Sequence, residues 1–390
     1  MSIDGGAAEA GRDPTGADRF LSSDVGRSLS VGVVAWVWAR VCVAAGFWVA
    51  HLLTPDPALS SRQDFPLPKG LLSWDSYFYD LIARGGYDAV AADGRRFFPL
   101  YSLLGRWTAP LFGGRVDVAL VVIGNLAALA GAVILAQLAR EVLRDRWGCD
   151  EADRVGLRSA WIVGILPAAI VFVWPYTEGL ALCATAGTLL ALHRRNWWWA
   201  AAFALSAGAL RPTGLLLGLP ILIELARTRP RPRVAPSLAA LAAAPVGAFA
   251  SLALIAHETG DWLAPWREQR PIRGDFRNPL LRAAESVWGL VHNTDTELVP
   301  FVVLWCVLLV VAVRRRQPWS WIAFSGVTLL VALAAQTIDS IGRYGLLAVP
   351  LVVALAQWTD RRWKEVLVAT VGSAGLVIYT AQALQGRIVP

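Results

Sequence analysis

Four charged residues of this sequence stand in apolar or aromatic surroundings. Asp75 follows Trp74 at the start of WDSYFYDLIARGGYD, Glu178 lies in VWPYTEG, Arg211 in GALRPTG and Arg343 in DSIGRYG. A carboxylate in such a setting can act as a general base, because it can take a proton from a reacting hydroxyl group. The planar guanidinium of arginine suits the binding of a phosphate. The four residues are candidates for a site that combines proton transfer with anion binding.

Simpler interpretations exist for each of these residues, and spacing alone leaves them open. Asp75 could be the N-cap of a helix that starts at this point, since aspartate is a favoured cap. Asp80 and Arg84 are four residues apart, which predicts a helical surface pair between them. Glu178 could be an ordinary glutamate at an interfacial helix start, and Arg211 could pair with it structurally.

A helical interpretation of the same stretch predicts which side chains share a face. Trp74, Phe78, Leu81 and Ile82 fall on one side, while Asp75, Tyr79 and Asp80 turn elsewhere. We expect this helix to lie along a membrane interface with its acids toward water or a cleft.

The composition predicts what kind of molecule must position these residues. Of the 390 residues, 56% are hydrophobic, 17% are charged and 19 are Trp, and the mean hydropathy is +0.50. A span needs roughly 20 apolar residues, and the many apolar runs indicate a polytopic membrane protein. Its net charge of +7 is explained by arginines that orient the chain in the membrane rather than by nucleic-acid binding. We expect a cytoplasmic tail at 1–30, disordered because it is rich in Gly and Ala, and a single membrane domain at 31–390.

Apolar runs predict about eleven spans. They cover roughly 31–53, 116–139, 159–176, 178–192, 197–210, 213–226, 237–256, 298–313, 318–338, 346–358 and 365–383. The runs near Glu178 and Arg211 are short and interrupted by Gly and Pro, which favours broken helices lining protein or a wet cavity.

Arginine-rich segments occupy every second junction between these spans. They are 140–158, 193–196, 227–233, 314–316 and 360–364, and the positive-inside rule assigns them to the cytoplasmic side. The other five junctions carry the long loop 54–115, YTEG, RPTG, the loop from His257 and DSIGRYG. We therefore expect the candidate residues to share the extracytoplasmic face.

The loop from His257 holds Asp261, Trp262 and several arginines, and it could bind substrate or simply contact solvent and lipid headgroups, where Trp is common. The four Cys and four His show no ligand spacing, so the sequence implies neither a disulfide framework nor a metal site.

Six segments, in order, resemble the PIG-V-like mannosyltransferases of the GT-C class of membrane glycosyltransferases. They are WDSYFYDLIARGGYD, FFPLYSLL, LPAAIVFVWPYTEGLAL, LSAGALRPTGLLLGLP, GDWLAPWREQ and DSIGRYGLLAVPL. The resemblance runs from about residue 71 to 356. It departs from the family at YTEG, where YTES is more common, and at Phe78, where a tryptophan is common. The Ala, Arg and Trp content suggests a bacterium of high GC content.

The resemblance implies an all-α, GT-C-like bundle with amphipathic interfacial helices in the first extracytoplasmic loop. It implies a mannosyltransferase of the cell membrane that uses polyprenyl-phosphate mannose and inverts the anomeric centre, with a lipid-linked or surface glycan as acceptor and no separate cofactor. Asp75 becomes the favoured general base, and Arg211 and Arg343 the donor-phosphate ligands. The residues expected to bind substrate or shape the site are Trp74, Tyr79, Tyr176, Glu178, Asp261, Trp262 and Tyr344.

Two other functions fit the same residues. Broken spans and arginines at depth also suit a flippase or carrier of a lipid-linked sugar, which would release no polyprenyl phosphate. A non-catalytic subunit of a glycan-assembly complex would account for the tryptophan-rich loop equally well.

Overall fold

The computed structural model describes residues 23–54, 66–292 and 298–390 of the chain. Within those ranges every regular element is a helix, apart from one isolated β-bridge between Phe276 and Ala335. Most of the predicted tail, residues 1–22, lies outside the described chain. Residues 24–30 are already helical, because Ser23 caps the helix by accepting a hydrogen bond from the Gly26 amide at 3.1 Å.

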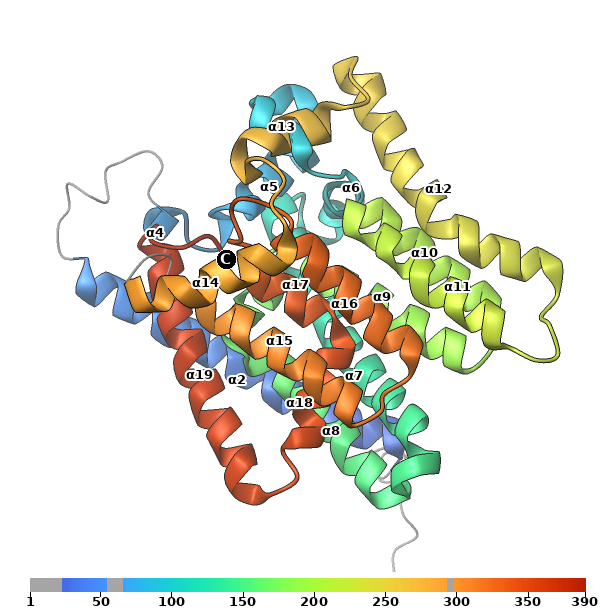
Figure 1. Cartoon of the computed structure of the whole chain (residues 1–390). Coiled ribbons are helices and arrows are strands. Elements are labelled where there is room, and N and C mark those ends of the chain that lie inside the picture. Colours follow the sequence, from blue (N-terminus) through green and yellow to red (C-terminus); the bar gives the residue numbers. More distant parts are fainter. Residues whose placement is uncertain (1–22, 55–65, 293–297) are drawn as a thin grey trace, which may run out of the picture.

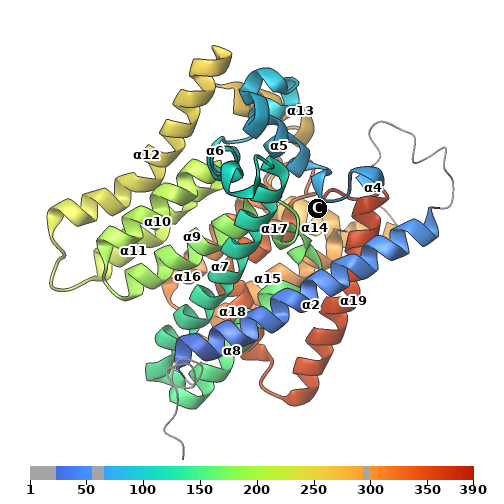
Figure 2. The same ribbon diagram turned by 180° about the vertical axis from the view of Figure 1, so that it is seen from behind.

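Figures 1 and 2 show these helices as one bundle seen from two sides. The α-helices are α2 (Asp24–Leu53), α4 (Pro66–Lys69), α5 (Asp75–Gly85), α6 (Leu100–Thr108), α7 (Val116–Trp147), α8 (Cys149–Ile165), α9 (Glu178–His193), α10 (Trp197–Leu210), α11 (Gly218–Arg227), α12 (Val234–Thr259), α13 (Ala264–Arg273), α14 (Pro279–His292), α15 (Val299–Arg314), α16 (Trp319–Leu333), α17 (Ile341–Leu347), α18 (Val349–Trp358) and α19 (Arg362–Leu384). The 3₁₀ helices are η1 (Gly70–Leu72), η2 (Gly86–Ala89), η3 (Ala92–Arg96), η4 (Ala109–Phe112), η5 (Pro167–Phe172) and η6 (Pro212–Leu217).

By length and composition, four of the described helices can cross a membrane on their own: α2, α7, α12 and α19. The pair α17 and α18, bent by 80° at a short break, would make a fifth if it forms one span. Four shorter apolar helices, α9, α10, α15 and α16, run beside them. The protein is therefore a multi-pass membrane protein.

The five arginine-rich segments gather at one end of the bundle. Arg194 binds Glu141 at 2.9 Å, and Arg195 donates to the Arg229 carbonyl at 3.3 Å. Arg146 donates to the Arg316 carbonyl at 3.0 Å. Arg315 in turn lies 3.6 Å from Asp360, so these contacts connect all five segments as the sequence predicted.

The other five junctions meet at the opposite end. Asp75 contacts Arg343 at 2.6 Å, and Glu178 contacts Arg211 at 2.7 Å. The loop after α12 joins them, because Arg273 donates to the Ser340 hydroxyl at 3.3 Å. In Figure 1, α5 and α13 lie at this end, near the far tip of α12.

The eleven expected spans correspond to helical segments of the described chain, of which four, or five with the bent pair, can cross a membrane by length and composition. The segments are α2, α7, α8 with η5, α9, α10, η6 with α11, α12, α15, α16, α17 with α18, and α19.

Several predicted spans differ in their boundaries from the helices that form: the helix predicted at 116–139 extends to Trp147, and the span at 346–358 is divided between α17 and α18. The apolar run at 159–176 predicts a single helix, whereas α8 begins at Cys149 inside the arginine-rich segment and ends at Ile165. Pro167 disfavours continuation of the α-helix, and η5 follows. The backbone is thus irregular just before Tyr176 and Glu178.

Small residues let neighbouring helices approach closely. A Cβ atom on Gly208 of α10 would lie 2.0 Å from the Ala244 carbonyl of α12, and one on Gly247 of α12 would lie 2.1 Å from the Leu205 carbonyl. On Gly179 of α9 it would lie 2.2 Å from the Gly124 carbonyl of α7. The Gly179 contact fixes the start of α9, which carries Glu178, against α7.

Candidate active site

Asp75 is the first residue of α5, and the chain enters this helix through an unusual backbone conformation. Trp74 has φ +59° and ψ −134°, a region that costs about 1–3 kcal/mol for a residue other than glycine. The indole Nε1 of Trp74 donates to the Ala383 carbonyl at 3.0 Å, which ties the entry of α5 to the end of α19. The turn delivers Asp75 into the bundle, where it is only 8% exposed.

The Asp75 carboxylate belongs to an ion-pair network rather than to a helix cap. Its Oδ2 accepts a hydrogen bond from Nη1 of Arg343 at 2.6 Å, and the same Nη1 lies 3.7 Å from Oε1 of Glu178. That Oε1 accepts from Nη1 of Arg211 at 2.7 Å. Since Glu178 is 2% exposed, its charge needs this pairing. The pair between Glu178 and Arg211 is therefore present, and the four charged candidates also lie together in one cluster.

Hydroxyl groups surround the two carboxylates. The Tyr176 hydroxyl accepts from the Asp75 amide at 3.3 Å, and the Thr177 hydroxyl contacts Oε2 of Glu178 at 3.3 Å. Tyr79, one helical turn after Asp75, lies 3.4 Å from the Thr177 hydroxyl. Burial raises the pKa of the Tyr79 phenol well above its usual range, so Tyr79 contributes a neutral hydroxyl group.

Two further arginines reach the network, and the sequence did not single them out. Nη2 of Arg96, from η3, lies 3.8 Å from Oδ1 of Asp75. Nη2 of Arg273, from α13, donates to the Tyr344 hydroxyl at 3.2 Å and to the Ser340 hydroxyl at 3.3 Å. Ser340 also accepts from Nη2 of Arg343 at 2.8 Å. The only local sequence feature that could have pointed to Arg96 as a site residue is its position beside two phenylalanines, in RRFF at 95–98.

The network carries an excess of positive charge. Arg96, Arg211, Arg273 and Arg343 stand against the buried carboxylates of Asp75 and Glu178, and the more exposed Asp93 lies 3.8 Å from Arg96. These seven side chains have a formal charge of +1. An anion such as a phosphate would balance this excess in surroundings of reduced dielectric, where charge interactions are strong. The arrangement can thus hold a phosphate beside a buried carboxylate.

A second polar cluster holds the irregular backbone that leads to Tyr176. Arg40, in the middle of α2, donates to the Phe172 carbonyl at 3.1 Å and also binds the side-chain oxygen of Asn125. Asn125 in turn donates to the Val173 carbonyl at 2.9 Å. These side chains bind carbonyls that the end of η5 leaves without helical partners, as membrane depth requires.

The inward face of α5 differs from the apolar face that its spacing suggested. The buried residues of this helix are Asp75, Ser76, Tyr79, Asp80, Ile82 and Ala83, so the acids face protein. Phe78 and Leu81 are only partly buried. The reason is that the polar side has partners inside the bundle, whereas Phe78 packs on Phe97 and under Arg96 near the surface. Asp80 pairs with Arg84 at 2.8 Å as predicted.

Two of the expected site residues have their contacts elsewhere. Asp261 pairs with Arg267 at 3.0 Å and accepts from the Leu263 amide at 2.9 Å, which makes it a local turn residue. Trp262 is 50% exposed and stacks on Phe249 of α12. Arg273 is the residue of this loop that reaches the network.

The described part of the chain holds no cluster of three or more His, Cys, Asp and Glu side chains that could bind a metal ion.

No known family profile matches the chain, and no curated protein is similar to it in sequence. Its fold is similar to that of the Archaeoglobus fulgidus oligosaccharyltransferase tethered with an acceptor peptide containing the NVT sequon. The TM-score is 0.50 at 12% identity, over 95% of this chain and 56% of that chain. The same enzyme in complex with zinc and sulfate gives a TM-score of 0.48 at 12% identity, over 92% and 53%. The chain spans about half the length of these proteins.

At this level of identity the similarity shows the fold alone. The expected all-α, GT-C-like architecture is confirmed. The PIG-V resemblance and the roles of individual residues stay predictions.

Proposed function

We propose that this protein is a membrane glycosyltransferase that moves mannose from a polyprenyl-phosphate donor to a lipid-linked or surface glycan, with inversion at the anomeric carbon. The plasma membrane is the proposed location, with the reaction on the extracytoplasmic face. One observation carries the proposal: a buried carboxylate, Asp75, lies within an arginine cluster of net positive charge, at the end of the bundle opposite the arginine-rich segments. The GT-C-like fold and the sequence resemblance support the choice of reaction.

In the proposed reaction, Asp75 removes the proton from the acceptor hydroxyl group. The acceptor oxygen then forms a bond to the anomeric carbon, and the bond between that carbon and the phosphate oxygen breaks. The bonding electron pair leaves with polyprenyl phosphate, so negative charge grows on the phosphate. The proton taken from the acceptor hydroxyl group stays on the Asp75 carboxyl group until solvent removes it.

The arginines stabilise this growing charge. Guanidinium groups in a site of reduced dielectric, already held in place, stabilise a developing anion at little cost of reorganisation. Arg343 and Arg211 are held by Glu178, which lies 3.7 Å and 2.7 Å from them. Glu178 therefore acts in this proposal as a positioning residue that orients both phosphate ligands.

Donor binding would also prepare the base. Nη1 of Arg343 donates to Oδ2 of Asp75 at 2.6 Å, so Arg343 and an acceptor hydroxyl group would compete for the same carboxylate. A donor phosphate that takes over the Arg343 donors would free Asp75 for the acceptor hydroxyl.

The experiment is donor turnover by the purified protein. With polyprenyl-phosphate mannose labelled in the sugar and a crude lipid extract as acceptor source, we expect release of polyprenyl phosphate and transfer of label to a new lipid or glycan product. Transport of labelled donor across vesicles without release would replace the proposal with a carrier. Neither release nor transport by the protein alone, with release restored by a co-purified partner, would favour a non-catalytic subunit.

A further inference from the structure

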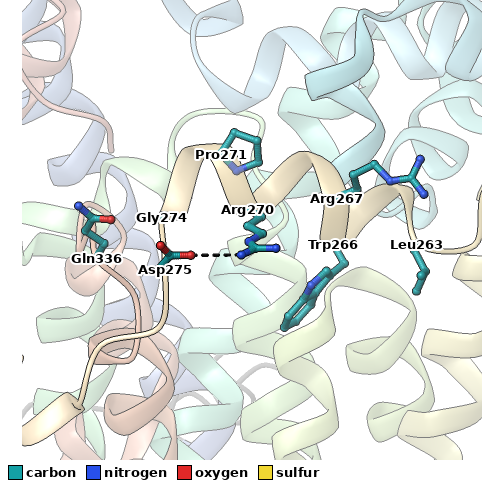
Figure 3. A pocket seen from close by; sticks show the side chains of 8 residues that line it. All are labelled: Leu263, Trp266, Arg267, Arg270, Pro271, Gly274, Asp275 and Gln336. Carbon is teal, nitrogen blue, oxygen red and sulfur yellow. Dashed lines mark hydrogen bonds and ion pairs between the residues drawn. The ribbon is translucent and has the colours of Figure 1, made fainter.

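A pocket lies beside α13, outside the ion-pair network, and its lining differs from that of the network. Its volume is about 480 Å³, within the range of about 300–1,000 Å³ that small-molecule sites occupy. The lining residues are Leu263, Trp266, Arg267, Arg270, Pro271, Gly274, Asp275 and Gln336, shown in Figure 3. We propose that this pocket binds a saccharide unit of the glycan acceptor; this rests on the proposed glycosyl transfer.

The first argument is the aromatic wall. Trp266 is 76% exposed and Leu263 is 63% exposed, and in Figure 3 both extend from the same side of α13. An indole face presents a flat apolar surface with a polar edge. The ring of a sugar offers a matching patch of C–H groups, whereas its hydroxyl groups need partners at the rim.

The second argument is the mixture of donors and acceptors at the rim. Arg270 supplies donors, Asp275 supplies acceptors, and the Gln336 amide supplies both. Sugar hydroxyl groups donate and accept, so they match this set.

A phosphate fits the same rim less well. Arg270 lies 3.3 Å from Asp275, and Arg267 lies 3.0 Å from Asp261. An anion would have to compete with both carboxylates. The chemistry of the pocket therefore favours a neutral polar ligand over a lipid phosphate, which distinguishes it from the network with its excess of positive charge.

The third argument is the connection between this pocket and the network. The Arg277 amide donates to the Ala334 carbonyl at 3.0 Å, and the Thr337 amide donates to the Arg273 carbonyl at 3.2 Å. The end of α13 is thus paired with the segment that leads to Ser340 and Arg343. Arg273 itself donates to the Ser340 hydroxyl, so the helix that lines the pocket also contacts the network.

Gly274 allows this arrangement. Its φ is +70°, and a Cβ atom there would lie 2.4 Å from Oε1 of Gln336. The glycine lets the chain turn at the end of α13 while the Gln336 side chain stays against the backbone.

The test measures sugar binding directly, in phosphatidylcholine nanodiscs that contain no sugar detergent. Saturation-transfer difference NMR with methyl α-D-mannopyranoside and α-1,6-mannobiose should give signals above those of empty nanodiscs. We expect these signals to fall at least fivefold in Trp266→Ala and in Gln336→Ala. They should persist in Trp107→Ala, which removes a tryptophan of similar exposure, 64%, from α6.

Unchanged signals in both pocket variants, or no signal from the unmodified protein, would overturn the saccharide site. An equal loss in Trp107→Ala would also overturn it and would indicate that exposed tryptophans act only by seating the protein in the membrane. Since the readout is binding, it is independent of donor turnover: sugar signals without polyprenyl phosphate release would retain the pocket and refute the transferase, and the reverse result would do the opposite.

Discussion

Replacement of Asp75 by Asn separates a catalytic role from a structural one. The amide has the shape of the carboxylate, so its oxygen can still accept from Nη1 of Arg343, now 2.6 Å from Oδ2. It cannot take a proton from an acceptor hydroxyl group. General-base catalysis contributes about 10²–10⁴ in rate, which corresponds to roughly 3–5.5 kcal/mol of activation free energy at 1.36 kcal/mol per tenfold.

The expected loss of stability is smaller than this loss of rate. A hydrogen bond to a charged group contributes about 1.5–3 kcal/mol and a neutral one about 0.5–1.5 kcal/mol. The substitution should therefore cost roughly 1–2 kcal/mol in folding, because Arg343 keeps the Glu178 carboxylate at 3.7 Å as a counter-charge and its contact with the Ser340 hydroxyl at 2.8 Å. Asp75→Asn should remain folded while its turnover of polyprenyl-phosphate mannose falls by two to four orders of magnitude.

The matched control is Asp80→Asn. Asp80 lies on the same helix, is 9% exposed against 8% for Asp75, and also pairs with an arginine, Arg84, at 2.8 Å. The control makes the same chemical change five residues away and should retain turnover within a few fold. The assay is polyprenyl phosphate release per monodisperse protein, with the thermal midpoint measured in parallel. Turnover of Asp75→Asn above about a tenth of the unmodified rate would refute the reasoning, and so would an equal loss in Asp80→Asn.

Three further substitutions test the network and the packing around it. Arg343→Lys replaces a planar fork by a point charge that cannot serve both carboxylates, so the KM for donor should rise and kcat should fall, together about 10²-fold; unchanged donor kinetics would contradict this. Glu178→Gln neutralises the carboxylate that contacts both Arg211 and Arg343 and should destabilise the fold by about 3–5 kcal/mol, whereas Glu141→Gln, in an exposed pair with Arg194, should cost about 1 kcal/mol or less. Thermal midpoints that fall equally would refute the buried pairing. Gly208→Ala forces a Cβ atom to within 2.0 Å of the α12 backbone and should cost about 1–3 kcal/mol. Gly218→Ala, with nothing within 4 Å and helical dihedral angles, should not lower the thermal midpoint.

Much of the architecture follows from the sequence, because membranes impose strong one-dimensional rules. Apolar runs of span length predict helices, and arginine-rich junctions predict which junctions share an end. The contacts among Arg194, Glu141, Arg315 and Asp360 bear out that grouping. For the same reason Asp75, Glu178, Arg211 and Arg343 were expected at one end.

The boundaries of irregular segments were harder to predict. The sequence pattern gave one span at 159–176, but Pro167 separates α8 from η5. The carbonyls that this break leaves are bound by Arg40 and Asn125, which come from α2 and α7. A broken helix at membrane depth depends on partners that are distant in sequence, and a hydropathy profile does not predict them.

Residue types and threading determined the candidate chemistry of this protein and the end of the bundle at which it lies. The sequence predicted the Asp80–Arg84 pair and offered the Glu178–Arg211 pair, but only the tertiary structure decided which other charges meet. Asp75 pairs with Arg343, which is 268 residues away in sequence. Arg96 and Arg273 also contact the network, whereas Asp261 and Trp262 contact residues outside it. The physical reason is that hydropathy and charge fix each helix along the membrane normal, whereas the lateral arrangement of helices depends on close packing at small residues and on pairing of buried charges.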